Sequence, residues 1–97
     1  MPDTCHLRVQ ITLLAPTARG PRTPRSAEFR TVLVSPGREH FAADVFPARA
    51  LVPGGAAVNC EVRFESPEAA GYFPAGTQFD VWENGQKGYG TTLAVLT

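Results

Sequence analysis

The sequence predicts an all-β protein, built as a six-stranded antiparallel β-barrel that is closed or nearly closed. Three observations predict this fold class. Apolar and polar residues alternate in short segments, which is the pattern of a strand with one face in a core and the other in water. Glycine and proline, nine of each among the 97 residues, separate these segments. No window keeps the 3.6-residue period of a helix, and closing the sheet removes its exposed edge strands.

Length and composition indicate a single domain covering residues 1–97. A chain of 97 residues, 43% of them hydrophobic and 19% charged, supports one core and differs from the low-hydrophobicity profile of a disordered chain. The first residues show no basic segment followed by a long apolar run, and no stretch of about 18 apolar residues occurs. We therefore expect a cytoplasmic protein with no membrane partner.

The first two strands are predicted at residues 7–13 and 29–34. Residues 7–13 alternate strictly between apolar and polar side chains. Residues 15–28 contain three prolines and one glycine, which interrupt both helices and ladders, so this segment is predicted to be a loop. Residues 29–34 are rich in β-branched and aromatic side chains and end at a Ser-Pro-Gly turn.

The third and fourth strands follow the same logic. Residues 41–45 alternate over a short run that Pro47 closes, and a Val-Pro-Gly-Gly turn follows at residues 52–55. Residues 58–65 alternate nearly as strictly as the first strand. This alternation places Cys60 inside the barrel.

The last two strands are predicted to form a hairpin. Residues 77–83 alternate, with Phe79 and Val81 on the apolar face. An Asn-Gly dipeptide follows at positions 84–85. It is the strongest short-range hairpin signal, because a type I′ turn needs two residues with positive φ. The sixth strand should then run over residues 86–96.

The inward positions of these strands predict the core, which should include Leu7, Val9, Ile11, Val58, Cys60, Val62, Phe79 and Val81. The two cysteines, Cys5 and Cys60, are far apart in the chain and form no C-x-x-C motif. This spacing gives neither a disulfide framework nor a zinc site, so we expect both thiols to be reduced.

The formal net charge is zero, but the charges are unevenly distributed. Residues 1–38 hold six arginines against two acidic residues, whereas residues 39–97 hold three basic residues against seven acidic ones. Arg19, Arg22 and Arg25 follow one another at three-residue intervals in the predicted proline-bearing loop. Their guanidinium groups could each pair with two phosphate oxygens. The alternative is an ordinary solvated loop.

Three motifs occur in a recognisable order: Arg22-Thr23-Pro24, Val52-Pro53-Gly54, and the run from Gly76 to Gly85. Their order and spacing resemble the C-terminal β-barrel, domain 3, of elongation factor Tu. In that family a His-Thr-Pro loop follows the first strand, a Val-x-Pro-Gly turn precedes the fourth, and a Gly-x-x-Phe strand enters a Glu-Gly-Gly-Arg hairpin. The resemblance covers nearly the whole chain and implies the same barrel.

The resemblance implies a non-catalytic binding module in translation. The family's barrel helps to hold the acceptor and T-stem region of aminoacyl-tRNA and packs against a nucleotide-binding domain. This chain lacks a G-x-x-x-x-G-K-[ST] loop, so GTP hydrolysis is excluded. Arg22 stands in place of the family's histidine, and Gln86 in place of its hairpin arginine, which removes one phosphate-pairing side chain. The partner is expected to be tRNA or another RNA, or alternatively a protein, either translation-related or a separately encoded domain.

The candidate binding residues come from the basic loop and from the last hairpin. Trp82 is predicted on the polar face of its strand, where an indole could stack on a base, anchor a partner protein or simply cap the barrel. The full set is Arg19, Arg22, Thr23, Arg25, Trp82, Asn84, Gly85, Gln86 and Lys87.

No catalytic or metal site is predicted, and no cofactor is expected. Ser35, His40 and Asp44 are the one nearby set with hydrolase chemistry. Residues four apart on a strand lie about 13 Å from each other, too far for the hydrogen bond that orients a catalytic base. His6 and His40 have no partners at metal-ligand spacing.

Overall fold

A computed structural model describes residues 5–15, 27–83 and 85–96. The elements are β1 (Cys5–Leu13), β2 (Phe29–Val34), β3 (His40–Pro47), β4 (Val58–Phe64), η1 (Pro67–Tyr72), β5 (Gln78–Trp82) and β6 (Gln86–Val95). All six predicted strands are present, with ends within two residues of those expected. Within the described residues, no helix is long and apolar enough to cross a membrane.

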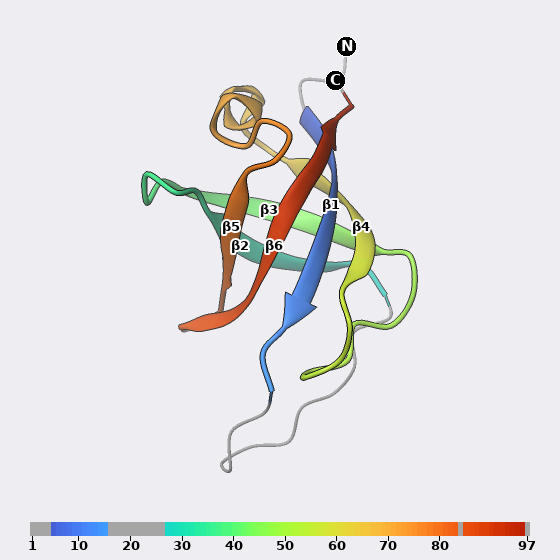
Figure 1. The fold of residues 1–97 in the computed structure, drawn as a ribbon. Coiled ribbons are helices and arrows are strands. Elements are labelled where there is room, and N and C mark those ends of the chain that lie inside the picture. The colour runs from blue at the N-terminus through green and yellow to red at the C-terminus, as the bar shows by residue number, and fades with distance from the viewer. Residues whose placement is uncertain (1–4, 16–26, 84, 97) are drawn as a thin grey trace.

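The six strands close into an antiparallel barrel in the order β1-β4-β3-β2-β5-β6, with β6 returning to β1 (Figure 1). The predicted fold class is therefore confirmed. The junctions between strands differ in length. β1 and β4 are in register from Cys5↔Phe64 to Ile11↔Val58, whereas β2 and β5 are joined only from Val32↔Trp82 to Val34↔Asp80. The β2–β5 junction is thus short.

The core fills the barrel and continues under the helix η1. All eight side chains predicted to be inside are buried. An aromatic cluster closes one end: the rings of Phe64 and Phe73 stack at 5.2 Å, and Phe41 and Phe79 meet Phe73 edge-on at 5.9 and 5.8 Å. This end of the barrel is therefore sealed by aromatic side chains rather than by a polar loop.

The segment Pro67–Tyr72, which falls between the fourth and fifth predicted strands, is a short 3₁₀-helix. The amide of Ala69 donates to the carbonyl of Ser66 at 3.2 Å, and that of Phe73 to the carbonyl of Ala70 at 3.1 Å. These are the i→i+3 bonds of a 3₁₀ turn. Six residues are too few to show a helical period in the sequence, which is why the pattern did not reveal it.

Strand β6 passes unusually close to β1 at two glycines. A Cβ atom on Gly88 would lie 2.5 Å from the carbonyl oxygen of Thr12, and one on Gly90 would lie 2.4 Å from that of Gln10. Real Cβ contacts are not this short, so only glycine fits at these positions. The two glycines therefore let the barrel close.

Candidate binding groove

One side of the barrel carries a lattice of matched charges on its outer surface. We call it the paired face; it comprises Arg8, Arg30, Asp44, Glu61, Arg63 and Glu65. Arg8 lies directly opposite Glu61 across β1 and β4, and Arg63 lies opposite Asp44 across β4 and β3. Opposite charges in such cross-strand positions attract, and they cancel one another's fields.

Arg30 is the centre of the best-connected group on the paired face. Its Nη1 donates to Oδ1 of Asp44 at 3.0 Å, and its Nη2 donates to the carboxylate of Glu65. Arg63 donates through Nε to Nε2 of His6 at 2.9 Å and lies 5.3 Å from the ring centroid of Phe46. The guanidinium groups of Arg30 and Arg63 already have partners, which leaves them little free positive charge for an incoming ligand.

A groove of about 480 Å³ lies elsewhere on the outer surface, between the turn that joins β2 to β3 and the outer faces of β5 and β6. We call it the groove and define it by Arg38, Gln78, Asp80, Gln86, Tyr89 and Thr91. It begins where the pairing between β2 and β5 stops, at Val34↔Asp80. The short junction is therefore the structural origin of the groove.

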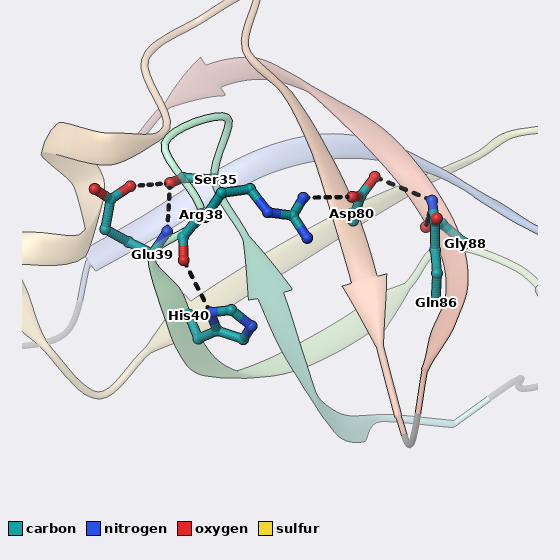
Figure 2. Close-up of polar contacts among 7 residues, drawn as sticks. All are labelled: Ser35, Arg38, Glu39, His40, Asp80, Gln86 and Gly88. Carbon is teal, nitrogen blue, oxygen red and sulfur yellow. Dashed lines mark hydrogen bonds and ion pairs between the residues drawn. The ribbon is translucent and has the colours of Figure 1, made fainter.

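The wall formed by the turn is held by a compact set of hydrogen bonds (Figure 2). The amide of Arg38 donates to the carbonyl of Ser35, and the amide of Ser35 to the carbonyl of Glu39, both at 2.9 Å. The Ser35 hydroxyl donates to the Glu39 carboxylate and accepts from the Glu39 amide at 3.1 Å. The turn is thus fixed by both backbone and side chain.

Arg38 has a backbone φ of 72°, in the left-handed region that glycine or asparagine normally occupies. An arginine there costs on the order of 1 kcal/mol. The conformation directs its side chain across the groove, where Nη1 lies 3.3 Å from Oδ2 of Asp80. A strained backbone at a side chain that lines a groove is an arrangement found at binding sites.

Asp80 connects the turn to the last hairpin. Its Oδ2 faces Arg38, and its Oδ1 accepts a hydrogen bond of 3.0 Å from Nε2 of Gln86, which also donates to the carbonyl of Gly88 at 3.3 Å (Figure 2). The opposite wall carries Tyr89, whose side chain is half exposed. The groove therefore combines a guanidinium, a carboxylate, an amide and an aromatic ring.

The structure describes four of the nine predicted site residues, Trp82, Gly85, Gln86 and Lys87, and one of them lines the groove. Gln86 lines it, and Gly85 forms the hairpin turn with a φ of 114°. Lys87 is half-buried on β6, and its carbonyl accepts from the amide of Leu14 at 2.9 Å. The predicted residues Arg19, Arg22, Thr23, Arg25 and Asn84 lie outside the described residues.

Trp82 occupies the predicted outer face of β5, but it is half-buried rather than exposed. Its ring meets that of His40 edge-on at 6.2 Å. Its Nε1 is buried and finds no hydrogen-bond partner among the described residues. The partner of Trp82 in register is Gln86, while Tyr89 lies opposite Asp80.

The set Ser35, His40 and Asp44 is not assembled as a catalytic group. Ser35 bonds to Glu39, Nδ1 of His40 lies 3.0 Å from the carbonyl of Arg38, and Asp44 pairs with Arg30. Within the described part of the chain, no group of three or more histidine, cysteine or acidic residues could hold a metal ion.

Arg38, Asp80 and Tyr89 were absent from the predicted binding residues. One signal in the sequence could have identified Arg38. The Ser-Pro-Gly turn is followed by an arginine at a hairpin position where a left-handed backbone is common. The register that brings Asp80 and Tyr89 opposite this turn joins residues more than 40 positions apart, so it could not be deduced from local pattern.

Comparison of the sequence with models of known protein families finds no match, and comparison with curated proteins finds no relative.

Proposed function

We propose that this chain is a non-catalytic, cytoplasmic binding barrel of the type that elongation factor Tu carries as its C-terminal domain, and that it contacts a protein partner through the groove. The observation that supports this proposal is the contrast in arginine environments. Arg30 on the paired face has two carboxylate partners, whereas the Arg38 guanidinium has one contact among the described residues, at 3.3 Å, and its side chain is 61% exposed. Arg38 therefore keeps free guanidinium donors at the groove.

The charge balance favours a protein over a nucleic acid at this surface. The described residues hold six basic side chains against eight acidic ones. Asp80 lies within the groove itself, and Glu39 lies in its turn. A nucleic acid presents closely spaced phosphates, which these carboxylates would repel. A protein segment can offer neutral groups and a single charge instead.

RNA binding is a second candidate, supported by the three loop arginines and by the resemblance to a tRNA-binding family. A site that uses two or three of Arg19, Arg22 and Arg25 should bind RNA with a log–log salt slope of roughly −1.4 to −2.7. Replacing Arg22 and Arg25 together by alanine should flatten this slope. Titration of a labelled tRNA at about 50 mM salt tests the idea, because low salt strengthens any surface contact. The absence of binding there would eliminate this candidate.

Affinity capture from a lysate, with RNA and protein identified separately, tests the proposed function. The wild type is compared with an Arg38→Ala/Tyr89→Ser variant and with Arg49→Ala as the matched control. Arg49 is exposed and follows the C-terminal end of β3, whereas the turn of the groove precedes the N-terminal end of that strand. A protein that is captured by the wild type and by the control, but not by the groove variant, is expected. If the groove variant captures the same proteins as the wild type, the proposal is contradicted.

A further inference from the structure

We infer that the groove accepts an extended segment of the partner protein with a single acidic residue at its contact point, which adds as a short strand beside Gln78 of β5 and places its carboxylate on Arg38. This inference rests on the proposed function and specifies its ligand. Two independent features carry it: an unpaired stretch of strand edge, and a guanidinium held beside that edge.

The unpaired edge arises because β5 extends beyond its neighbour. Pairing between β2 and β5 ends at Val34↔Asp80, yet β5 continues to Gln78. The chain of β2 cannot follow, because the amide of Ser35 is already bonded to Glu39 and the next residue, Pro36, has no N–H. Among the residues that the structure describes, Gln78 therefore has no strand partner on the β2 side.

The direction of the Gln78 backbone groups follows from the neighbouring bonds. The amide of Thr92 donates to the carbonyl of Thr77 at 2.9 Å, so this carbonyl points toward β6 and the N–H of Gln78, in the same peptide group, points away from it. Successive residues of a strand turn their backbone groups to opposite neighbours. Gln78 must then direct its N–H and C=O away from β6, toward the groove. An extended peptide could pair with both groups, which is the mode of recognition by strand addition.

Arg38 supplies the charge preference. The distance of 3.3 Å to Asp80 is longer than the roughly 2.7–2.9 Å of a strong charge-assisted bond. The contact uses one of five N–H donors of the guanidinium. Because Gln86 occupies the other oxygen of Asp80, Asp80 is held in place and acts to orient Arg38. A carboxylate from the partner could then form a two-bond pair with the remaining donors.

Tyr89 completes the match to an extended segment. Its half-exposed ring lines the same groove, across from the turn that carries Arg38. In an extended peptide, alternate side chains point to the same face. One side chain could place its carboxylate at Arg38 while the next on that face packs on the ring. An acidic residue followed two positions later by an apolar one is the expected motif.

Selection from a displayed library of random ten-residue peptides tests the inference, followed by amide chemical-shift mapping of the wild-type protein with the selected peptides. Enriched peptides should carry an aspartate or glutamate two positions from an apolar residue. The largest shifts should fall on Arg38, Gln78 and Asp80, and the Gln78 amide should exchange more slowly with solvent. Shifts at the paired face, or an unprotected Gln78 amide, would overturn strand addition.

Two variants and one control separate the parts of the inference. Arg38→Ala should weaken binding of the selected peptides by about tenfold or more, and remove the preference for acidic over amide side chains. Gln78→Pro, which deletes the N–H, should weaken binding more than Gln78→Ala, which keeps it. Arg49→Ala should bind as the wild type does. Equal effects of Arg38→Ala and Arg49→Ala would contradict a carboxylate site.

The remaining outcomes also decide between ligands. Enrichment of neutral or basic peptides, or no enrichment, would overturn the acidic segment, while groove-dependent capture from lysate would still leave the proposed function standing. If adding a labelled tRNA at about 50 mM salt reversed the chemical-shift changes that the peptides cause at Arg38, the groove would be assigned to nucleic acid instead. Loss of groove-dependent capture would remove both proposals.

Discussion

The paired face and the groove are built from the same barrel, and they differ in how completely their polar groups are matched. On the paired face, β1 and β4 are joined along the run from Cys5 to Ile11, and each charge lies near an opposite one. At the groove, β2 and β5 are joined over three residue pairs, and Arg38 adopts a strained backbone. Satisfied groups contribute to the fold, whereas unsatisfied ones are available for recognition.

The difference has a simple origin in chain direction. Hairpin neighbours such as β2 and β3 share a turn, and every residue of β2 pairs with β3. β2 and β5 become neighbours only because the sheet closes. β2 ends at Val34, opposite Asp80, so the first residues of β5 lie beyond the end of β2. Closure of a barrel from strands of unequal length leaves an unpaired edge at one junction. In this chain that edge is where the polar side chains and the tyrosine gather.

The largest expected effect is a substitution that disturbs closure beneath the groove. Gly90→Ala would place a Cβ 2.4 Å from the carbonyl oxygen of Gln10 and 2.6 Å from the ring of Phe79. We expect the free energy of unfolding to fall by about 3 kcal/mol or more, because neither backbone nor buried ring can yield easily. Urea denaturation measures this loss.

Gly71→Ala is the matched control for that substitution, since nothing lies within 4 Å of its added Cβ. Its free energy of unfolding should change by less than about 0.5 kcal/mol. If the two alanine variants unfold alike, β6 does not approach β1 as closely as described.

The titration of Cys60 reports whether water reaches the core beneath the paired face. Burial raises the pKa of its thiol from 9.0 to about 11. The thiol of the unfolded chain ionises at a lower pH than the buried thiol, so ionisation favours the unfolded chain. The stabilisation that depends on the un-ionised thiol is therefore fully present below pH 9 and is lost as the pH rises through 11, by up to about 3 kcal/mol.

Cys60→Val isolates that contribution because it keeps the volume and removes the titrating group. The difference in free energy of unfolding between the wild type and Cys60→Val should shift between pH 8 and pH 11, with the wild type losing more. A difference that stays constant across this range would mean that water reaches the thiol.

Val62 tests the packing of β4 under the paired face. Its side chain is fully buried, so Val62→Ala should lower the free energy of unfolding by about 1–3 kcal/mol through lost burial and a residual cavity. Val95 on β6 is 42% exposed, and Val95→Ala should cost less than about 0.5 kcal/mol. Thermal or urea denaturation compares them. Equal losses would mean that the inward register of β4 is wrong.

The fold could be predicted from the sequence, because strand alternation and turn residues are local signals. Leu7, Val62 and Phe79 are buried as their alternation predicted. The 3₁₀-helix at Pro67–Tyr72 was missed because it is shorter than any detectable period. The groove was missed for another reason: its residues come together only through the β2–β5 register, which no local pattern encodes. Its one predicted residue, Gln86, came from the hairpin motif.

The smallest expected changes in the free energy of unfolding come from one arginine substitution on each surface, and they compare the paired face with the groove directly. Arg30→Ala on the paired face removes contacts to Asp44 and Glu65, and because these contacts are exposed to solvent, their loss should lower the free energy of unfolding only slightly. Arg38→Gly at the groove also removes an exposed ion pair, to Asp80. It relieves the positive φ of 72° as well, so the variant should be as stable as the wild type, or more stable by up to about 1 kcal/mol.

Binding should respond in the opposite sense to stability in these two variants. Arg30→Ala should bind the selected acidic peptides as the wild type does, because Arg30 is not part of the groove. Arg38→Gly should no longer bind these peptides, although its free energy of unfolding is unchanged or higher. Urea denaturation and peptide titration of both variants give the four values needed. If Arg38→Gly proved less stable than Arg30→Ala, the side chain of Arg38 would serve the fold, and the strain at its backbone would have no explanation in recognition.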